Sequence, residues 1–177
     1  VMFLDSDDWL YPHAAERVAQ AFGPGVAKVQ YRLDMVDGAG GHIDLFPAPE
    51  VTFDDGDVVP LLLSTGRYET TVTSGNAFAR FALEAILPMP VQDFRISADG
   101  YLVTVAPLYG PVASIDEPLG AYVQHGGNLW STAGADLGAR FRRSMEHDLH
   151  RYAALRAKAA ERGLALRDEP GLRDPLH

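Results

Sequence analysis

Three carboxylates follow a short apolar run at the beginning of the chain. The run is Val1 to Leu4, and Asp5, Asp7 and Asp8 come directly after it. Such a run predicts a buried strand, and acidic side chains at its end lie at a sheet edge, where a metal ion or a phosphate-bearing ligand can bind. Asp5 and Asp7 are two apart, so on an extended chain they point to the same side. Oxygen-rich sites of this kind suit Mg²⁺ or Mn²⁺.

The carboxylates also have a purely structural interpretation. Those after the first strand can cap a helix that begins near Pro12, and for Asp-x-Asp alone the two interpretations are equally good. Asp99 lies where another helix is expected to begin, and its local sequence favours a role at the helix N-terminus. Its functional interpretation is a general base that accepts the proton of a substrate hydroxyl.

Two further segments carry polar groups that could act on a ligand. His125 follows an expected strand and opens a glycine-rich loop, and imidazole can join carboxylates in binding Mn²⁺. Ser74, Gly75 and Asn76 form an expected turn whose small side chains could shape an acceptor pocket. An exposed loop histidine and an ordinary turn are the simpler interpretations. The arginines of the last helical segment are interpreted as a solvated face.

Strands and helices alternate in the first part of the chain and mix later, which favours an α/β or α+β domain. Strands are expected at 26–35 and 42–46, either side of a glycine-rich turn, after a helix that ends at Gly23. The remaining expected elements are a short helix around 58–62 capped by Asp54 or Asp55, an extended segment at 70–73, a strand running into a helix over 78–87, a helix over 97–108, strands at 112–115 and 119–123, an amphipathic helix over 137–162 and a frayed tail from 167.

Composition narrows the class of protein. The chain has 177 residues, of which 47% are hydrophobic, and suits one domain with a substantial core. A net charge of −9 argues against a nucleic-acid partner, although a divalent cation can still bridge acidic residues to a nucleotide ligand. The absence of cysteine excludes disulfides and thiolate metal sites. Neither a signal peptide nor an apolar run of the ~18 to 20 residues of a membrane helix is evident, so we expect a cytoplasmic protein, with membrane association through regions outside this chain left open.

The order of these blocks resembles the inverting family 2 glycosyltransferases of the GT-A fold. The acidic segment FLDSDDWL comes first, and a Ser-Gly-Asn turn follows about seventy residues later. Asp99 then precedes Tyr101 and Leu102, and a strand ends in the sequence Tyr-Val-Gln-His-Gly-Gly-Asn at residues 122–128. The similarity extends from residue 1 to about residue 132, and FLDSDDWL is its most specific part.

The resemblance implies metal-dependent transfer of a sugar, with inversion, from a nucleotide-diphosphate donor to an acceptor hydroxyl. Asp5 and Asp7 match the family's Asp-x-Asp, which implies that Asp7, helped by His125, binds the metal on the donor diphosphate. Asp5 would lie nearer the sugar or ribose, with Asp8 as an accessory in donor binding. Asp99 matches the catalytic base. The resemblance also implies that the donor-sugar and acceptor pocket is lined by Ser74, Gly75 and Asn76.

The chain departs from the family pattern in three ways. Ala98 stands where another acid usually precedes the base, and Val123 stands where an arginine is often found. Members also carry roughly a hundred residues before the Asp-x-Asp strand, which build the nucleotide pocket. We therefore expect a GT-A-like mixed sheet flanked by helices that lacks its N-terminal nucleotide-binding half. The expected division is a partial domain at 1–135 and an amphipathic helix and tail at 136–177.

Two consequences are expected from the missing half. The exposed edge of the first strand should pair with a second copy of the chain or make it prone to aggregation. The chain alone should also have little or no transferase activity. The acceptor is left open among a saccharide, a lipid-linked carrier and a protein, as are the donor and the choice between Mg²⁺ and Mn²⁺.

Two other functions compete with the transferase. Phosphatases of the haloacid-dehalogenase type also begin with a strand and Asp-x-Asp, but their pattern has a threonine where this chain has Trp9. The second alternative is a non-catalytic binding or assembly module derived from such a domain. Its contact surface would be the amphipathic helix that begins at Leu137.

Overall fold

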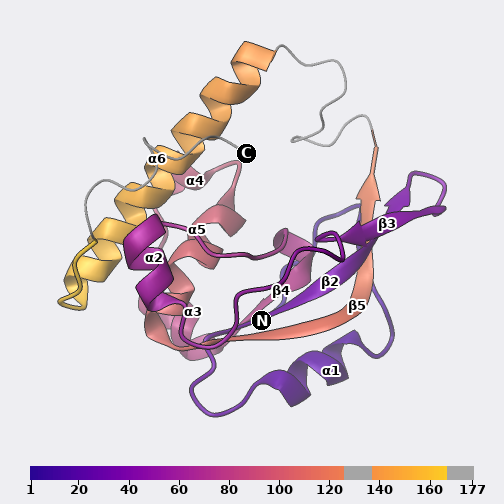
Figure 1. Cartoon of the computed structure of the whole chain (residues 1–177), viewed down its shortest axis with the longest axis horizontal. Helices are drawn as coiled ribbons and strands as arrows, with labels where there is room; N and C mark the ends of the chain where they lie inside the picture. The colour runs from indigo at the N-terminus through magenta and orange to yellow at the C-terminus, as the bar shows by residue number, and fades with distance from the viewer. Residues whose placement is uncertain (126–136, 167–177) are drawn as a thin grey trace.

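The computed structural model describes residues 1–125 and 137–166, and a five-stranded mixed sheet forms their centre (Figure 1). Its two long strands, β2 (Lys28–Asp37) and β5 (Val112–Gln124), are parallel neighbours. The other strands pair antiparallel: β1 (Trp9–Leu10) with β5, and both β3 (His42–Phe46) and β4 (Asn76–Phe78) with β2. A mixed sheet with flanking helices confirms the expected α/β class.

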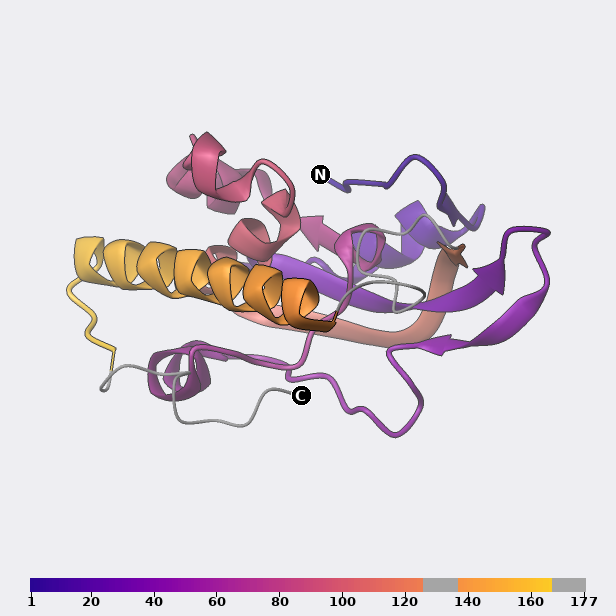
Figure 2. The ribbon, with the colours of Figure 1, turned by 90° about the horizontal axis from the view of Figure 1, so that it is seen from above.

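Helices pack on the sheet and beside one of its ends, and the β2–β3 hairpin projects at the opposite end (Figures 1 and 2). Helix α1 covers β5 by burying Ala14 and Val18 against Val29, Leu33 and Leu119. No helix within the described residues combines the length and apolar composition needed to cross a membrane. The helical elements are α1 (Ala14–Ala21), α2 (Val59–Thr65), α3 (Arg80–Ile86), α4 (Val91–Phe94), α5 (Ala98–Val105), α6 (Leu137–Glu161) and the 3-10 turns η1 (Thr73–Gly75) and η2 (Ala106–Tyr109).

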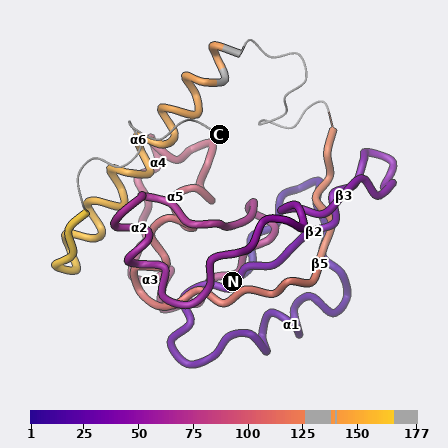
Figure 3. Tube along the Cα trace, viewed as in Figure 1, coloured from indigo at the N-terminus to yellow at the C-terminus, as the bar shows by residue number. Residues whose placement is uncertain are grey.

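The long helix α6 contacts α4 and α5, and its C-terminal part packs beside α2, as the trace in Figure 3 shows. Leu155 and Ala159 are fully buried in this contact, whereas Phe141, Met145 and Leu149 on the predicted apolar stripe are exposed. The predicted helix is confirmed, but only the C-terminal half of its stripe belongs to the core. The domain boundary at 135 stays a prediction, and the expected loop at 126–128 and tail from 167 lie outside the described residues.

The first strand is the main correction. The run Val1 to Leu4 makes only one β-bridge, between Met2 and Ala77, and Val1, Phe3 and Leu4 are exposed. Met2 bridges to Ala77, the middle residue of β4, and among the described residues no strand pairs on its other side. An apolar run becomes a buried strand only when neighbours cover it, and here that cover is missing.

Two smaller predictions also differ. The strands expected at 112–115 and 119–123 are one strand, β5, which shifts register against β2 between Tyr31 and Asp34 and so passes through Pro118 without ending. The short helix α2 begins beside Asp57, whose Oδ1 accepts the backbone N–H of Val59 at 3.1 Å, rather than at Asp54 or Asp55.

Buried polar side chains on β2 fix the long segment that leads to η1. The ammonium group of Lys28 is fully buried and donates to Gln30 Oε1 at 2.7 Å, Tyr68 OH at 2.8 Å and Thr70 Oγ1 at 2.6 Å. These three partners are uncharged, and burial lowers the pKa of Lys28 well below its usual value. Hydrogen bonds of this kind hold residues 68–70 against the sheet, and thereby set the position of the turn that follows.

Candidate functional site

The predicted carboxylates lie on a turn that follows the short bridge. The N–H of Asp8 donates to the carbonyl oxygen of Asp5 at 3.2 Å, which closes the turn. Asp5 and Asp7 are exposed, whereas Asp8 is buried. The backbone N–H of Asp5 donates to Ser74 Oγ at 3.1 Å, and this hydrogen bond attaches the turn to η1.

Asp8 attaches the acidic turn to the last strand. Its Oδ1 accepts the N–H of Val123 at 2.9 Å, while its buried Oδ2 has no hydrogen-bond partner. Burial raises the pKa of Asp8, the nearby Ser74 hydroxyl and the N–H of Val123 lower it, and the charge of Asp7 raises it again. A buried carboxylate oxygen without a partner is costly unless something else binds it.

Asp7 and His125 meet across the same strand end. His125 directly follows β5, as predicted, and its Nε2 lies 2.8 Å from Asp7 Oδ2. Both side chains remain partly exposed. Two residues predicted to share a metal are therefore neighbours, although more than a hundred residues separate them in the sequence.

Asp99 is part of the same electrostatic region. It lies in the first turn of α5, as predicted, and is half-buried. Partial burial raises the pKa of Asp5, and the charges of Asp8, Asp99 and Asp7 raise it further in that order. The fold thus brings the carboxylates of the acidic turn and of α5 near enough to repel one another.

Ser74 supports this region from within the protein. Its side chain is fully buried, and its hydroxyl receives the N–H of Asp5. Tyr31, on the central strand β2, donates its hydroxyl to the carbonyl oxygen of Ser74 at 2.7 Å. The acidic turn is therefore connected through Ser74 to the middle of the sheet.

Gly75 and Asn76 are also buried, and their visible contacts are structural. A Cβ on Gly75 would lie 2.5 Å from Thr71 Cγ2 and 2.9 Å from the carbonyl oxygen of Tyr31, so a larger residue has no space. The Asn76 amide donates to the carbonyl oxygens of Thr71 and Val72 at 3.1 and 2.7 Å. The predicted contacts of these residues with a substrate stay a prediction.

The donor atoms of the region suit a hard divalent cation. Within residues 1–125 and 137–166, no three His, Asp or Glu side chains are gathered closely enough to hold a metal ion alone. Mg²⁺ is usually bound by one or two carboxylates together with water and substrate phosphates, so a preformed cage is not required. The carboxylate of Asp7 and the imidazole of His125, neighbours at the surface, fit such a cation bound together with a diphosphate.

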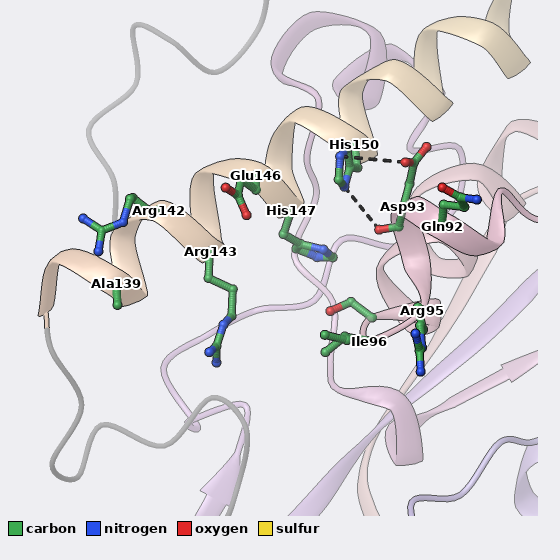
Figure 4. A pocket seen from close by; sticks show the side chains of 11 residues that line it. Gln92, Asp93, Arg95, Ile96, Ala139, Arg142, Arg143, Glu146, His147 and His150 are labelled. Atoms are coloured by element: carbon green, nitrogen blue, oxygen red, sulfur yellow. Dashed lines mark hydrogen bonds and ion pairs between the residues drawn. The ribbon is translucent and has the colours of Figure 1, made fainter.

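A cleft beside α5 was missed by the sequence reasoning. It has a volume of about 460 Å³ and lies between α6 and the segment joining α4 to α5 (Figure 4). His147 of α6 packs on the first turn of α5 so closely that a Cβ on Gly100 would lie 2.3 Å from its Cε1. The sequence does show two histidines and several arginines in this helix, but their spacing alone does not distinguish residues that line a cleft from a solvated face.

Comparison with known proteins gives one informative similarity. No family model matches the chain. A protein of Nostoc sp. (strain PCC 7120) named as an uncharacterized glycosyltransferase is 32% identical over 130 residues, which is 72% of this chain. The same stretch is 40% of that relative, so the chain spans less than half of the relative's length. The similarity supports glycosyl transfer in general and leaves the metal, the stereochemistry and the acceptor open.

Proposed function

We propose that this chain forms the metal- and acceptor-binding part of an inverting family 2 glycosyltransferase with a GT-A fold. The supporting observation is the convergence of Asp5, Asp7 and Asp8 with His125 and Asp99, from three separate parts of the chain, in one region. The similarity to a protein named as a glycosyltransferase supports the reaction class. The donor is a sugar linked to a nucleoside diphosphate, and the acceptor supplies a hydroxyl group.

Asp99 accepts the proton of the acceptor hydroxyl while that oxygen attacks the anomeric carbon. The new carbon–oxygen bond forms on one face of the sugar, and the bond to the diphosphate breaks on the other, so the configuration inverts. Asp7 and His125 hold the divalent cation, with Asp5 nearer the sugar or ribose. A bound cation would supply positive charge against the departing diphosphate. Asp8 fixes the turn to β5.

Exchange of Asp99 for asparagine tests the proposed base. Asp99→Asn removes the proton acceptor but keeps the shape of the side chain. We therefore expect turnover to fall at least ~100-fold when it is measured in the natural polypeptide, that is, the protein as the cell makes it. Donor affinity should stay within about twofold, because Asp99 belongs to the acceptor side of the site. Product formation from a panel of nucleotide-sugars measures the first quantity, and calorimetric titration of the donor measures the second.

The matched control is Asp55→Asn, the same change at an exposed position outside the site. It should leave both turnover and donor affinity unaltered. Retention of full turnover by Asp99→Asn would remove Asp99 from the role of base.

A non-catalytic assembly module is the second candidate, and one observation favours it. Phe141, Met145 and Leu149 form an exposed apolar stripe along the N-terminal half of α6, which could serve as a contact surface. In that case the natural polypeptide would show no transfer with any donor, and Asp99→Asn would change nothing. The turnover assay therefore separates the two candidates.

A further inference from the structure

The hydroxyl of Ser74 lies at both ends of the acidic turn, Asp5 to Asp8. Its oxygen accepts the backbone N–H of Asp5 at 3.1 Å. Burial raises the pKa of Asp8, and the same hydroxyl, which lies near that carboxylate, acts to lower it. A hydroxyl donates one hydrogen bond and accepts two, so a single serine can serve both ends of the turn.

Ser74 is itself held by the central strand of the sheet. Its side chain is fully buried, and its carbonyl oxygen accepts the hydroxyl of Tyr31 at 2.7 Å. Tyr31 belongs to β2 and is also fully buried. The next residue, Gly75, packs so closely on β2 that a Cβ there would lie 2.9 Å from the carbonyl oxygen of Tyr31. The hydroxyl of Ser74 therefore has a fixed position relative to the sheet.

Strand β5 holds the same turn from a second direction. Oδ1 of Asp8 accepts the N–H of Val123 at 2.9 Å, and two residues further along the chain His125 Nε2 lies 2.8 Å from Asp7 Oδ2. Asp7 lies between Asp5 and Asp8 in the sequence, so the anchors of these two residues determine where its carboxylate meets the imidazole. The partly exposed pair is thus placed by contacts that lie inside the protein.

We propose that Ser74 is a positioning residue, whose buried hydroxyl holds the acidic turn in the shape in which Asp7 and His125 bind the cation and the donor diphosphate. This inference rests on the proposed transferase function. It gives Ser74 a role different from the pocket lining that the family resemblance implies, because a fully buried side chain offers no surface to a substrate. Residues that orient metal ligands without touching the metal typically change its affinity 10- to 100-fold when they are removed.

A positioning role and a substrate contact predict different kinetics for Ser74→Ala. A serine that lined the acceptor pocket would, when lost, raise KM for the acceptor. A serine that positions the acidic turn would instead raise KM for the donor and the Mn²⁺ concentration that gives half of the maximal rate. In that case kcat at saturating donor and metal, and KM for the acceptor, should stay within about twofold of the parent values.

Two measurements on the natural polypeptide test the inference without turnover. In the metal-free protein, amide hydrogen exchange of the peptide that contains Asp5 and Asp8 should become about tenfold faster in Ser74→Ala, because the N–H of Asp5 loses its acceptor. Calorimetric titration with uridine and guanosine diphosphates in the presence of Mn²⁺ gives the second quantity. We expect Ser74→Ala to weaken the binding of the preferred diphosphate about tenfold.

The matched control is Ser114→Ala, which removes a hydroxyl of β5 that accepts the amide of Gln30 at 3.0 Å, outside the acidic turn. Neither the exchange of the turn nor the affinity for the diphosphate should change in this variant. Thermal melts establish that each variant is folded.

A second variant acts on Ser74 indirectly and decides the question if Ser74→Ala does not fold. Tyr31→Phe removes only the hydroxyl that holds the carbonyl oxygen of Ser74, while the ring still fills the core. It should speed the exchange of the turn and weaken diphosphate binding, each about threefold. Its control is Tyr101→Phe, which loses a hydroxyl that donates to the carbonyl oxygen of Ile86 at 2.6 Å and should leave both quantities unaltered.

The two proposals fail differently. A parent protein that binds the diphosphate, with equal affinity in Ser74→Ala and Tyr31→Phe, would overturn the role of Ser74 and leave the transferase intact, even if the turn exchanged faster. A raised KM for the acceptor with unaltered donor affinity would likewise overturn it and return Ser74 to the acceptor pocket. A parent protein that binds no diphosphate with Mn²⁺ and transfers no sugar would overturn the transferase, and the role of Ser74 with it.

Discussion

Asp8 and His125 connect the acidic turn to the end of β5 in two different ways. Asp8 is buried and holds the N–H of Val123, whereas His125 pairs with Asp7 at the surface. The first contact is structural, and we propose that the second exchanges for a cation. The local sequence was enough to identify Asp7 and Asp8, because three aspartates after an apolar run are informative by themselves. His125 was identified because it opens a glycine-rich loop after a strand. The local sequence could not show that Asp8 is the buried one, since that depends on β5.

Lys28 gives a prediction of how the free energy of unfolding depends on pH. Its folded pKa lies well below 10.5 because it is buried, so between the folded pKa and 10.5 the unfolded chain binds more protons. The free energy of unfolding should therefore rise with pH across that window, by at most ~1.4 kcal/mol per pH unit. Below the folded pKa, both states are protonated and this contribution is constant.

Lys28→Met removes the ionisable group, and the variant should lack this rise. Urea unfolding at intervals from pH 7 to pH 10 measures it, as the difference between the parent and Lys28→Met. That subtraction removes the titration of other groups. Parallel stability curves for the two proteins would contradict a depressed pKa at Lys28.

At the scale of elements, the spacing of apolar residues was sufficient to predict a helix or strand wherever the element's own sequence carries that spacing. The helix α6, the β2–β3 hairpin and the start of α5 were predicted for this reason. Periodicity failed for Val1 to Leu4, because a strand is buried by its neighbours and not by its own sequence. It also missed the contact of His147 with Gly100, which joins two helices that are separate in the sequence.

The close packing of α5 and α6 predicts an unusual cost for a small substitution. Gly100→Ala would normally stabilise a helix by up to ~1 kcal/mol. Here the new Cβ would lie 2.3 Å from His147 Cε1, so we expect a net loss of about 1 to 3 kcal/mol. Denaturant unfolding measures the change.

A double-mutant cycle supplies the control for this prediction. In a His147→Ala background the clash is absent, so Gly100→Ala should become neutral or stabilising. The same loss in both backgrounds would mean that the histidine ring does not occupy the space above Gly100.

For the whole molecule, an apolar segment lies exposed beside the sheet, with the side chains of Val1, Phe3 and Leu4. An uncovered apolar edge of this kind invites pairing with another strand. Association of this chain with a second copy, and its lack of activity when isolated, stay predictions.

The central claim is that Asp7 and its neighbours bind a nucleoside diphosphate through a divalent cation. The most direct measurement is calorimetric titration of the natural polypeptide with uridine and guanosine diphosphates, with Mn²⁺ and with a chelator, for the parent, Asp7→Ala and the control Asp55→Ala. We predict that one diphosphate binds only with Mn²⁺, that Asp7→Ala weakens this binding at least ~10-fold, and that Asp55→Ala does not. Binding that is independent of the metal, or equal in Asp7→Ala and the parent, would contradict the account.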